Sequence, residues 1–117
     1  MSAFLDKYVA YGGDAEGVMD RFMGDEELLE TCLDQFVAGD DFEVLKGTIE
    51  KQDFNAAFEC AHALKGVVGN LGITPLYNTI CVLVEELRAH DYTRVDEHLA
   101  DVIAKQEEFV VAYEGMK

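Results

Sequence analysis

The sequence predicts an all-α fold, an up-down antiparallel four-helix bundle with short additional helices at the N-terminus. In each long segment, apolar residues recur three and four positions apart, which is the period of an amphipathic helix. The chain has one proline and no Ser- or Gly-rich tract, so we expect short connections and no linker. Its 117 residues suffice for one domain, which we assign to residues 1–117.

Two short helices are expected first. One covers Phe4 to Ala10 and ends at Gly12-Gly13, because paired glycines interrupt a helical pattern. The other covers about Ala15 to Phe22 and ends at Gly24. Asp25 then stands where an N-cap is needed for the segment that follows.

The next segment, from Glu26 to about Lys51, has helical spacing on both sides of Gly39-Asp40-Asp41. The local residue types favour a kink or a break near Gly39, whereas the family resemblance described below favours one long helix. We predict a continuous but bent helix. The positions expected to carry its apolar face are Leu29, Leu33, Phe36, Val37, Val44, Leu45, Thr48 and Ile49.

Three further helices complete the predicted bundle. The first runs from Phe54 to Leu71, between Asp53 as N-cap and Gly72 as a left-handed terminator. The second opens with Thr74 as N-cap and Pro75 at the first helical position, and continues to about Ala89. The third runs from about Thr93 to Tyr113. The residues expected on the buried edge of this last helix are Val95, Leu99, Val102, Ile103, Gln106, Phe109, Val110 and Tyr113.

The helix over residues 54–71 contains the most informative stretch of the chain. At about 100° per residue, Lys65, Gly66 and Gly69 all lie within about 60° of His62 and form one stripe. The apolar side chains expected on the opposite, buried side are Cys60, Leu64, Val67 and Leu71. His62 is therefore expected to be exposed to solvent, with a cation one turn away.

Gly66 and Gly69 should each cost about 1 kcal/mol relative to alanine inside a helix. Close packing of a neighbouring helix is one explanation for them. Because both lie away from the apolar face, we interpret them instead as a flat surface that lets another protein approach the imidazole.

This part of the sequence resembles a known family. The order His62, Leu64-Lys65-Gly66 and Asn70-Leu71-Gly72 is similar to that of the histidine-containing phosphotransfer (HPt) domains of bacterial and eukaryotic phosphorelays. The upstream phrase Arg21-Phe22-Met23-Gly24-Asp25-Glu26-Glu27-Leu28-Leu29 is similar to the usual lead-in to that family's long helix. Together the two segments extend the resemblance over nearly the whole chain.

The resemblance implies a phosphorelay intermediate in two-component signalling. His62 would accept a phosphoryl group from a receiver-domain aspartate and pass it to another receiver aspartate. The implied partners are response-regulator receiver domains, a hybrid histidine kinase, or both. The chain itself would need no cofactor, because Mg²⁺ would be held by the receiver. It has neither the length for an ATP-binding domain nor a Gly-rich phosphate loop, so no ATP-dependent kinase activity is expected.

The residue types suit this chemistry. A neutral imidazole has a free lone pair near pH 7 and can attack phosphorus directly, and the Lys65 ammonium can stabilise phosphoryl charge. Some family members use a polar residue on the next helix to bond the imidazole, but Val84 occupies the facing position here. Phe58 and Glu59, together with Gly66 and Gly69, are candidate partner-docking residues; alternatively, Phe58 folds onto a neighbouring helix.

Composition limits the other functions. With 24 acidic and 9 basic residues the net charge is −15, which disfavours binding to nucleic acid or to anionic membranes. Three cysteines in apolar patterns suit reduced core thiols. The N-terminal apolar run breaks at Asp6, and no stretch approaches about 20 apolar residues, so neither a signal peptide nor a membrane span is predicted. We expect a cytoplasmic monomer.

Two other functions fit part of the sequence. Glu59 and His62 have the Glu-x-x-His spacing of di-iron carboxylate bundles, but the second copy that such a site needs is missing, because Leu87 precedes His90 and Val95 precedes His98 at that spacing. His90 and His98 are accordingly assigned structural or solvated roles. The other alternative is a non-catalytic acidic helical adaptor, which would bind a signalling partner by its surface alone and would not depend on His62.

Overall fold

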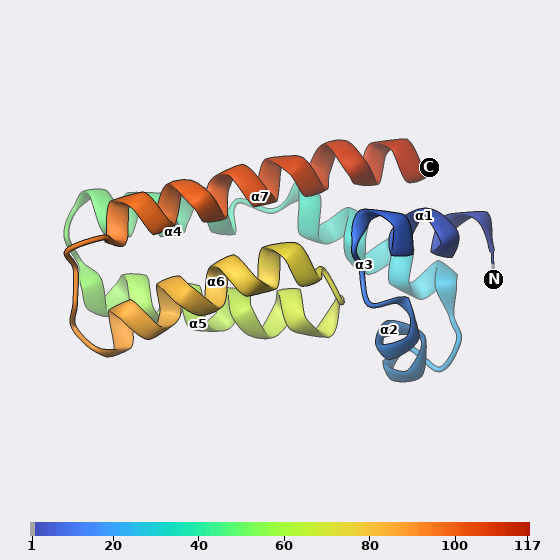
Figure 1. The fold of residues 1–117 in the computed structure, drawn as a ribbon, viewed down its shortest axis with the longest axis horizontal. Helices are drawn as coiled ribbons and strands as arrows, with labels where there is room; N and C mark the ends of the chain where they lie inside the picture. The colour runs from blue at the N-terminus through green and yellow to red at the C-terminus, as the bar shows by residue number, and fades with distance from the viewer. Residues whose placement is uncertain (1) are drawn as a thin grey trace.

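The computed structural model describes residues 2–117 and is helical throughout (Figure 1). The seven helices of this part of the chain are α1 (Ala3–Tyr11), α2 (Ala15–Arg21), α3 (Glu26–Ala38), α4 (Asp41–Glu50), α5 (Phe54–Asn70), α6 (Thr74–Arg88) and α7 (Val95–Met116). No strand occurs within residues 2–117, so the all-α prediction is confirmed.

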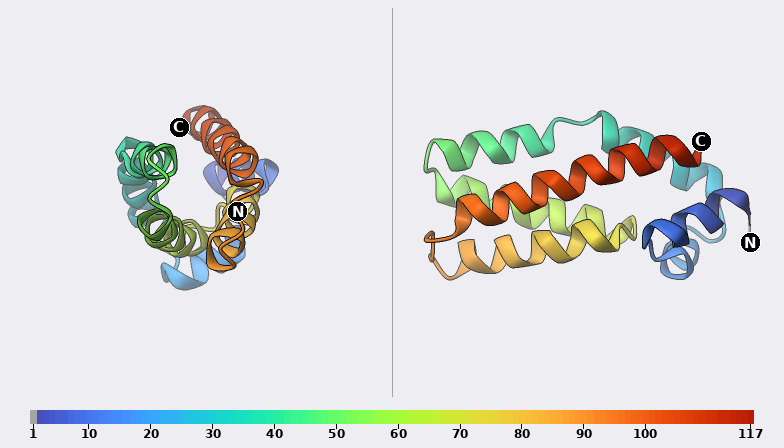
Figure 2. Two further views of the ribbon diagram at one scale, coloured as in Figure 1. Left: turned by 90° about the vertical axis from the view of Figure 1, so that its left-hand side faces the viewer. Right: turned by 45° about the horizontal axis from the view of Figure 1, so that its top comes forward.

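The helices form an elongated bundle with principal extents of 43 × 23 × 20 Å (Figures 1 and 2). The helices α5 and α6 pack as an antiparallel pair, α6 also packs on α7, and α4 packs on α5. The 22-residue helix α7 runs first along α4 and then along α3, so it lies beside both parts of the segment predicted as one long helix (Figure 2). The short helices α1 and α2 lie at the end of the α5–α6 pair (Figure 1).

The prediction of a continuous helix through Gly39 is wrong. The helix α3 ends at Ala38, and Gly39 adopts an extended conformation with φ −75° and ψ 165°. The helix α4 begins at Asp41, and the acidic residues Asp41 and Glu43 in its first turn interact favourably with the helix dipole. The break thus occurs where glycine and aspartate favour an end and a new start.

The break also changes which residues face the core. At about 100° per residue, a straight helix continued from Leu33 would place Val44 about 20° from it and Phe42 and Leu45 about 180° and 120° away. In the structure Val44 is 49% exposed, contrary to prediction, whereas Phe42 and Leu45 are buried. Phe42 packs edge-on against Phe36 at 5.8 Å between ring centroids, across the break.

A single hydrophobic core runs through the bundle. On α5 its members are Ala57, Ala61, Leu64 and Val68, followed by Leu71 in the turn. Val67 is 44% exposed, so its predicted burial is wrong, and Cys60 is only half-buried. The buried stripe is rotated from the predicted one, so that Ala57 and Ala61 face the core in place of Cys60 and Val67. All three cysteines are half-buried free thiols.

The capping predictions are confirmed at three sites and wrong at one. The Asp25 and Asp53 carboxylates accept hydrogen bonds from the Leu28 and Ala56 amides, and Gly72 has a left-handed φ of 70°. Thr74, however, is already helical; Ile73 occupies the N-cap position and caps with no side chain. The Ile73 side chain is fully buried, and this anchors the chain in the core where α6 begins.

The N-terminal segment donates hydrogen bonds to carbonyl groups at the C-terminus of α5 and in the turn that follows it. The Arg21 guanidinium donates to the carbonyls of Asn70 at 2.9 Å and Gly69 at 3.1 Å. The Tyr8 hydroxyl donates to the Leu71 carbonyl, and the Asp14 amide donates to the Gly72 carbonyl at 2.9 Å. Gly72 is required here, since a Cβ would lie 2.3 Å from a Val18 methyl group.

Candidate functional site

The helix α5 presents His62 to solvent. Its neighbours at the core side, Ala61 and Leu64, are buried, and this places the imidazole on the opposite, exposed side as predicted. Ala63, Gly66 and Val67 are exposed beside it. Ala63 and Gly66 leave this side of the imidazole clear, so the approach of another protein from there is unobstructed.

No hydrogen bond or ion pair within residues 2–117 involves the His62 ring, whereas the other two imidazoles each have a polar contact. Val84 on α6 is fully buried, so it offers no polar support. The contact that the ring does make is with Phe58, one turn earlier, at 5.6 Å between centroids and 25° between planes. Both ring nitrogens are consequently free for chemistry.

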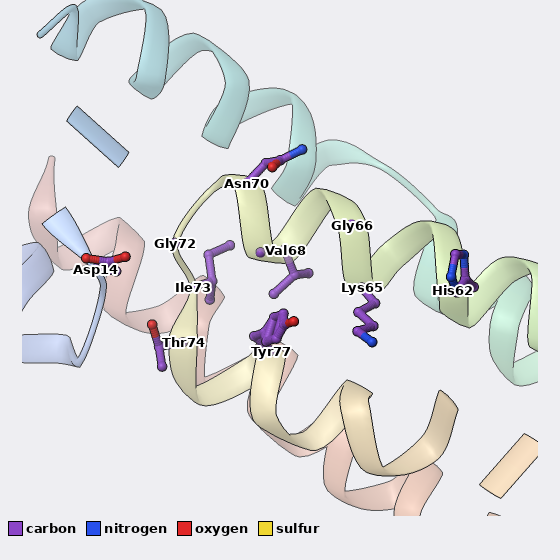
Figure 3. Close-up of a pocket in the computed structure, with 11 residues that line it drawn as sticks. Asp14, His62, Lys65, Gly66, Val68, Asn70, Gly72, Ile73, Thr74 and Tyr77 are labelled. Carbon is purple, nitrogen blue, oxygen red and sulfur yellow. The ribbon is translucent and has the colours of Figure 1, made fainter. Parts of the chain in front are cut away.

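A groove with a volume of about 510 Å³ adjoins His62 and runs toward the α5–α6 turn (Figure 3). Lys65 from α5 and Tyr77 from α6 line it, and Asp14 and Thr74 lie at its far end. Lys65 is half-buried and forms none of the ion pairs found in residues 2–117. Its ammonium group is thus available to an anion bound near His62.

The two glycines of the stripe differ. A Cβ on Gly66 would meet nothing within 4 Å, in agreement with an open surface. A Cβ on Gly69 would lie 3.2 Å from the Tyr77 ring, so the expectation that no helix of the same domain approaches this glycine is wrong. Gly69 permits the close packing of α6 on α5.

Tyr77 is the lining residue that sequence reasoning missed. Its hydrogen bond with the Cys81 side chain raises the pKa of the phenol, and its ring covers Gly69. The turn at Gly72 could have predicted this contact, because two antiparallel helices that reverse direction there bring residue 77 opposite residue 69. Glycine opposite an aromatic ring is a packing arrangement that a single helical wheel cannot reveal.

A second hollow lies on the other side of Phe58. Phe58 and Glu59 line it together with Leu87 and Arg88 from α6. The Arg88 guanidinium carbon lies 5.1 Å from the centre of the Phe58 ring. Phe58 is half-buried and packs against the core cluster, so it partly folds onto the neighbouring helix, and Glu59 is exposed beside it.

Charge is unevenly distributed around the bundle. The helix α5 carries one acidic residue, Glu59, and one basic residue, Lys65. In contrast, α3 carries four acidic residues and no basic one, and α7 carries six acidic residues and one basic one. The helix that carries His62 is therefore close to neutral in a chain of net charge −15.

The other histidines lie elsewhere and are engaged. The His98 imidazole contacts the Glu86 carboxylate between α7 and α6. The His90 ring is 2.9 Å from the Tyr92 hydroxyl, in a turn where His90 has a φ of 55°. Within residues 2–117, no three side chains among His, Cys, Asp and Glu come together as a metal-binding group would require.

The comparisons agree with this geometry. The family model described as "Hpt domain" matches residues 26–108, from the start of α3 into α7. Searches of curated proteins and of solved structures give no significant match. None of the helices in residues 2–117 has the length and apolar character required to span a membrane. The chain therefore belongs to the Hpt domain family, whose members carry phosphoryl groups on a histidine in two-component phosphorelays.

Proposed function

We propose that this protein accepts a phosphoryl group on His62 from the aspartyl phosphate of a receiver domain and passes it to the aspartate of another receiver. The observation that carries the proposal is the exposed imidazole on α5, which no other residue of the described chain, 2–117, hydrogen-bonds and which lies beside a lysine at a groove.

The transfer needs no base from this chain. The lone pair of a neutral His62 nitrogen forms the N–P bond while the P–O bond to the donor aspartate breaks, and the carboxylate leaves with the electron pair. The other ring nitrogen keeps its proton or releases it to water, since no side chain among residues 2–117 hydrogen-bonds to it. Passing the group to a second aspartate reverses these steps.

Lys65 would stabilise the phosphoryl oxygens during transfer. It lies one turn from His62 on the same side of α5 and lines the adjacent groove. Phosphoryl transfer depends mainly on positioning and electrostatic stabilisation, so a cation at this place can act without touching the nucleophile. Mg²⁺ is expected to be bound by the receiver.

The surface around His62 suits a receiver. A receiver that holds Mg²⁺ would do so with carboxylates, and a near-neutral helix face limits repulsion when such a surface approaches. Ala63 and Gly66 have a methyl group and no side chain, respectively, so a partner can approach the backbone of α5 closely there. Glu59 and Gly66 are the main proposed docking residues, and the half-buried Phe58 is a minor one. Gly69 contributes indirectly, by allowing Tyr77 to pack beside the groove.

The test is transfer of labelled phosphate from a phosphorylated receiver with Mg²⁺. We expect label on His62 as a phosphoramidate that is lost in acid and persists in alkali. H62Q should fold normally and take no label, whereas H90Q, the matched control, should be labelled as the parent protein is. Label on H62Q would contradict the assignment. Label from ATP alone would contradict the proposal that the chain has no kinase activity.

The alternative is a non-catalytic adaptor that binds a signalling partner by its acidic surface. It predicts that H62Q supports partner binding and signalling as well as the parent protein does. The exposed, unobstructed imidazole favours the carrier over the adaptor.

A further inference from the structure

We infer that Phe58 and Arg88 are positioning residues that hold the His62 imidazole for phosphotransfer. The inference rests on the proposed function and assigns to an aromatic stack the role that a hydrogen bond to the imidazole would otherwise have. It also gives Phe58 a role that differs from partner docking.

The stack is built from neighbouring turns of two helices. Phe58 lies one turn before His62 on α5, and the two rings are 5.6 Å apart at 25°. From α6, the Arg88 guanidinium carbon lies 5.1 Å from the Phe58 ring centre, within the range of a cation–π contact. The Arg88 Nε in turn lies 3.4 Å from Glu85.

Phe58 can act as a fixed support because it is itself held. It is half-buried and packs against the core cluster, and Arg88 adds a contact from the facing helix. An exposed phenylalanine would share the motion of His62 and could not restrict it.

Nothing else within residues 2–117 fixes the imidazole. Neither ring nitrogen has a hydrogen-bond partner, and the facing residue Val84 is buried and apolar. Rotation of an exposed side chain between staggered conformers is rapid and nearly free. The Phe58 ring is therefore the group that selects the orientation in which His62 meets the donor phosphorus, and small errors in that orientation slow transfer.

The same contacts argue against Phe58 as mainly a docking anchor. Hot-spot aromatic residues insert into a pocket on the partner and need free ring surface. Here His62, Arg88 and the core already occupy much of the Phe58 surface. A docking role predicts a change in receiver affinity, whereas a positioning role predicts a change in maximal rate.

The experiment combines NMR of the unphosphorylated protein with single-turnover transfer across receiver concentrations. In F58L, which keeps apolar volume, the ring-proton resonances of His62 should move downfield as the ring current is lost. The maximal rate should fall about 5- to 10-fold with a nearly unchanged half-saturating concentration. R88A should move the same resonances less and slow transfer about 2- to 3-fold, and R88K should recover part of the loss.

The matched control is R94A, because Arg94 pairs with Glu97 in the same i,i+3 geometry as Glu85–Arg88. It should leave both readouts unchanged. Unmoved His62 resonances in F58L and R88A, or a raised half-saturating concentration with the parent maximal rate, would overturn the inference. R88A alters an exposed side chain, so it decides the matter even if F58L is unstable. Failure of the parent protein to take label would instead overturn the proposed function, while the resonances still report on the stack.

Discussion

The Arg21 Nε donates a hydrogen bond to the Asn70 carbonyl at 2.9 Å, joining two residues 49 positions apart in the sequence. The family match begins at residue 26, so α2 lies outside it. The N-terminal segment nevertheless caps the helix that carries His62, because Arg21, Tyr8 and the Asp14 amide donate hydrogen bonds to carbonyls at the end of α5 and in the turn after it. A cation at this end also interacts favourably with the helix dipole.

We expect R21A to lower the free energy of unfolding by about 1 kcal/mol, since two charged hydrogen bonds are lost but the site is exposed. For a domain of this size that is a fall of about 4 °C or more in Tm. R94A removes an ion pair that is fully exposed to solvent and should leave stability nearly unchanged. Thermal unfolding of both variants makes the comparison; equal effects would show that capping of α5 by Arg21 contributes nothing specific.

The two glycines should respond differently to alanine. G66A should raise stability by up to about 1 kcal/mol, because helix propensity improves and the new methyl group meets nothing within 4 Å. In G69A the methyl group would lie 3.2 Å from Tyr77, so the gain should be offset or reversed. Denaturant unfolding measures both effects. In a Y77L background the aromatic ring is absent, so G69A should there raise the free energy of unfolding as G66A does. Stabilisation by G69A in the parent protein would contradict the packing found for Tyr77.

A larger side chain at Gly66 tests docking rather than stability. G66Q should fold as well as the parent protein but should slow phosphotransfer, because its side chain stands beside His62 on the open surface. Transfer assays at several receiver concentrations check this. An unchanged rate would exclude Gly66 from the docking surface.

The sequence was sufficient for the features that depend on local chemistry. The Asp25 and Asp53 caps, the left-handed Gly72 and the exposure of His62 follow from residue type and helical period. Contacts between helices were not accessible in this way. The position of Tyr77 over Gly69 depends on the register of α6 against α5, which one helical wheel does not contain.

The break at Gly39 also depends on contacts that the helical period does not contain, and it decides which residues of α4 face the core. Helical spacing continued across Gly39, but burial of Phe42 and Leu45 required a new register, and Val44 became exposed as a result. The choice between a bend and a break depended on packing with Phe36, which is a tertiary contact. Likewise, Arg88 over Phe58 joins two helices whose pairing the pattern of either helix alone does not give.

Asp34 gives a pH-dependent prediction at the junction of α3 and α7. Hydrogen bonds from Lys117 and Tyr113 lower the pKa of the Asp34 carboxyl below its ordinary value of 3.8. A lowered folded-state pKa stabilises the fold above the unfolded-state pKa, and this contribution disappears as pH falls through the folded-state value. D34N should therefore reduce Tm at neutral pH but flatten its decrease below about pH 4. Parallel Tm–pH curves for the two proteins would contradict this.

Lys65 should affect the rate of transfer and not the extent of folding. Its ammonium has no ion-pair partner within residues 2–117 and lines the groove beside His62, so its positive charge is available to the phosphoryl oxygens. Because the side chain is half-exposed, its stabilisation of the transition state is modest, and K65A should slow transfer in the bound complex about 10- to 30-fold, equivalent to roughly 1.4 to 2 kcal/mol. The control is K46A on α4, which removes the same charge from an exposed residue that does not line the groove and should leave the rate within about twofold of the parent value. Quenched-flow transfer at saturating receiver measures both variants. If K46A slowed transfer as much as K65A, overall charge rather than the position of Lys65 would be responsible; if neither did, the phosphoryl group would be stabilised by the receiver alone.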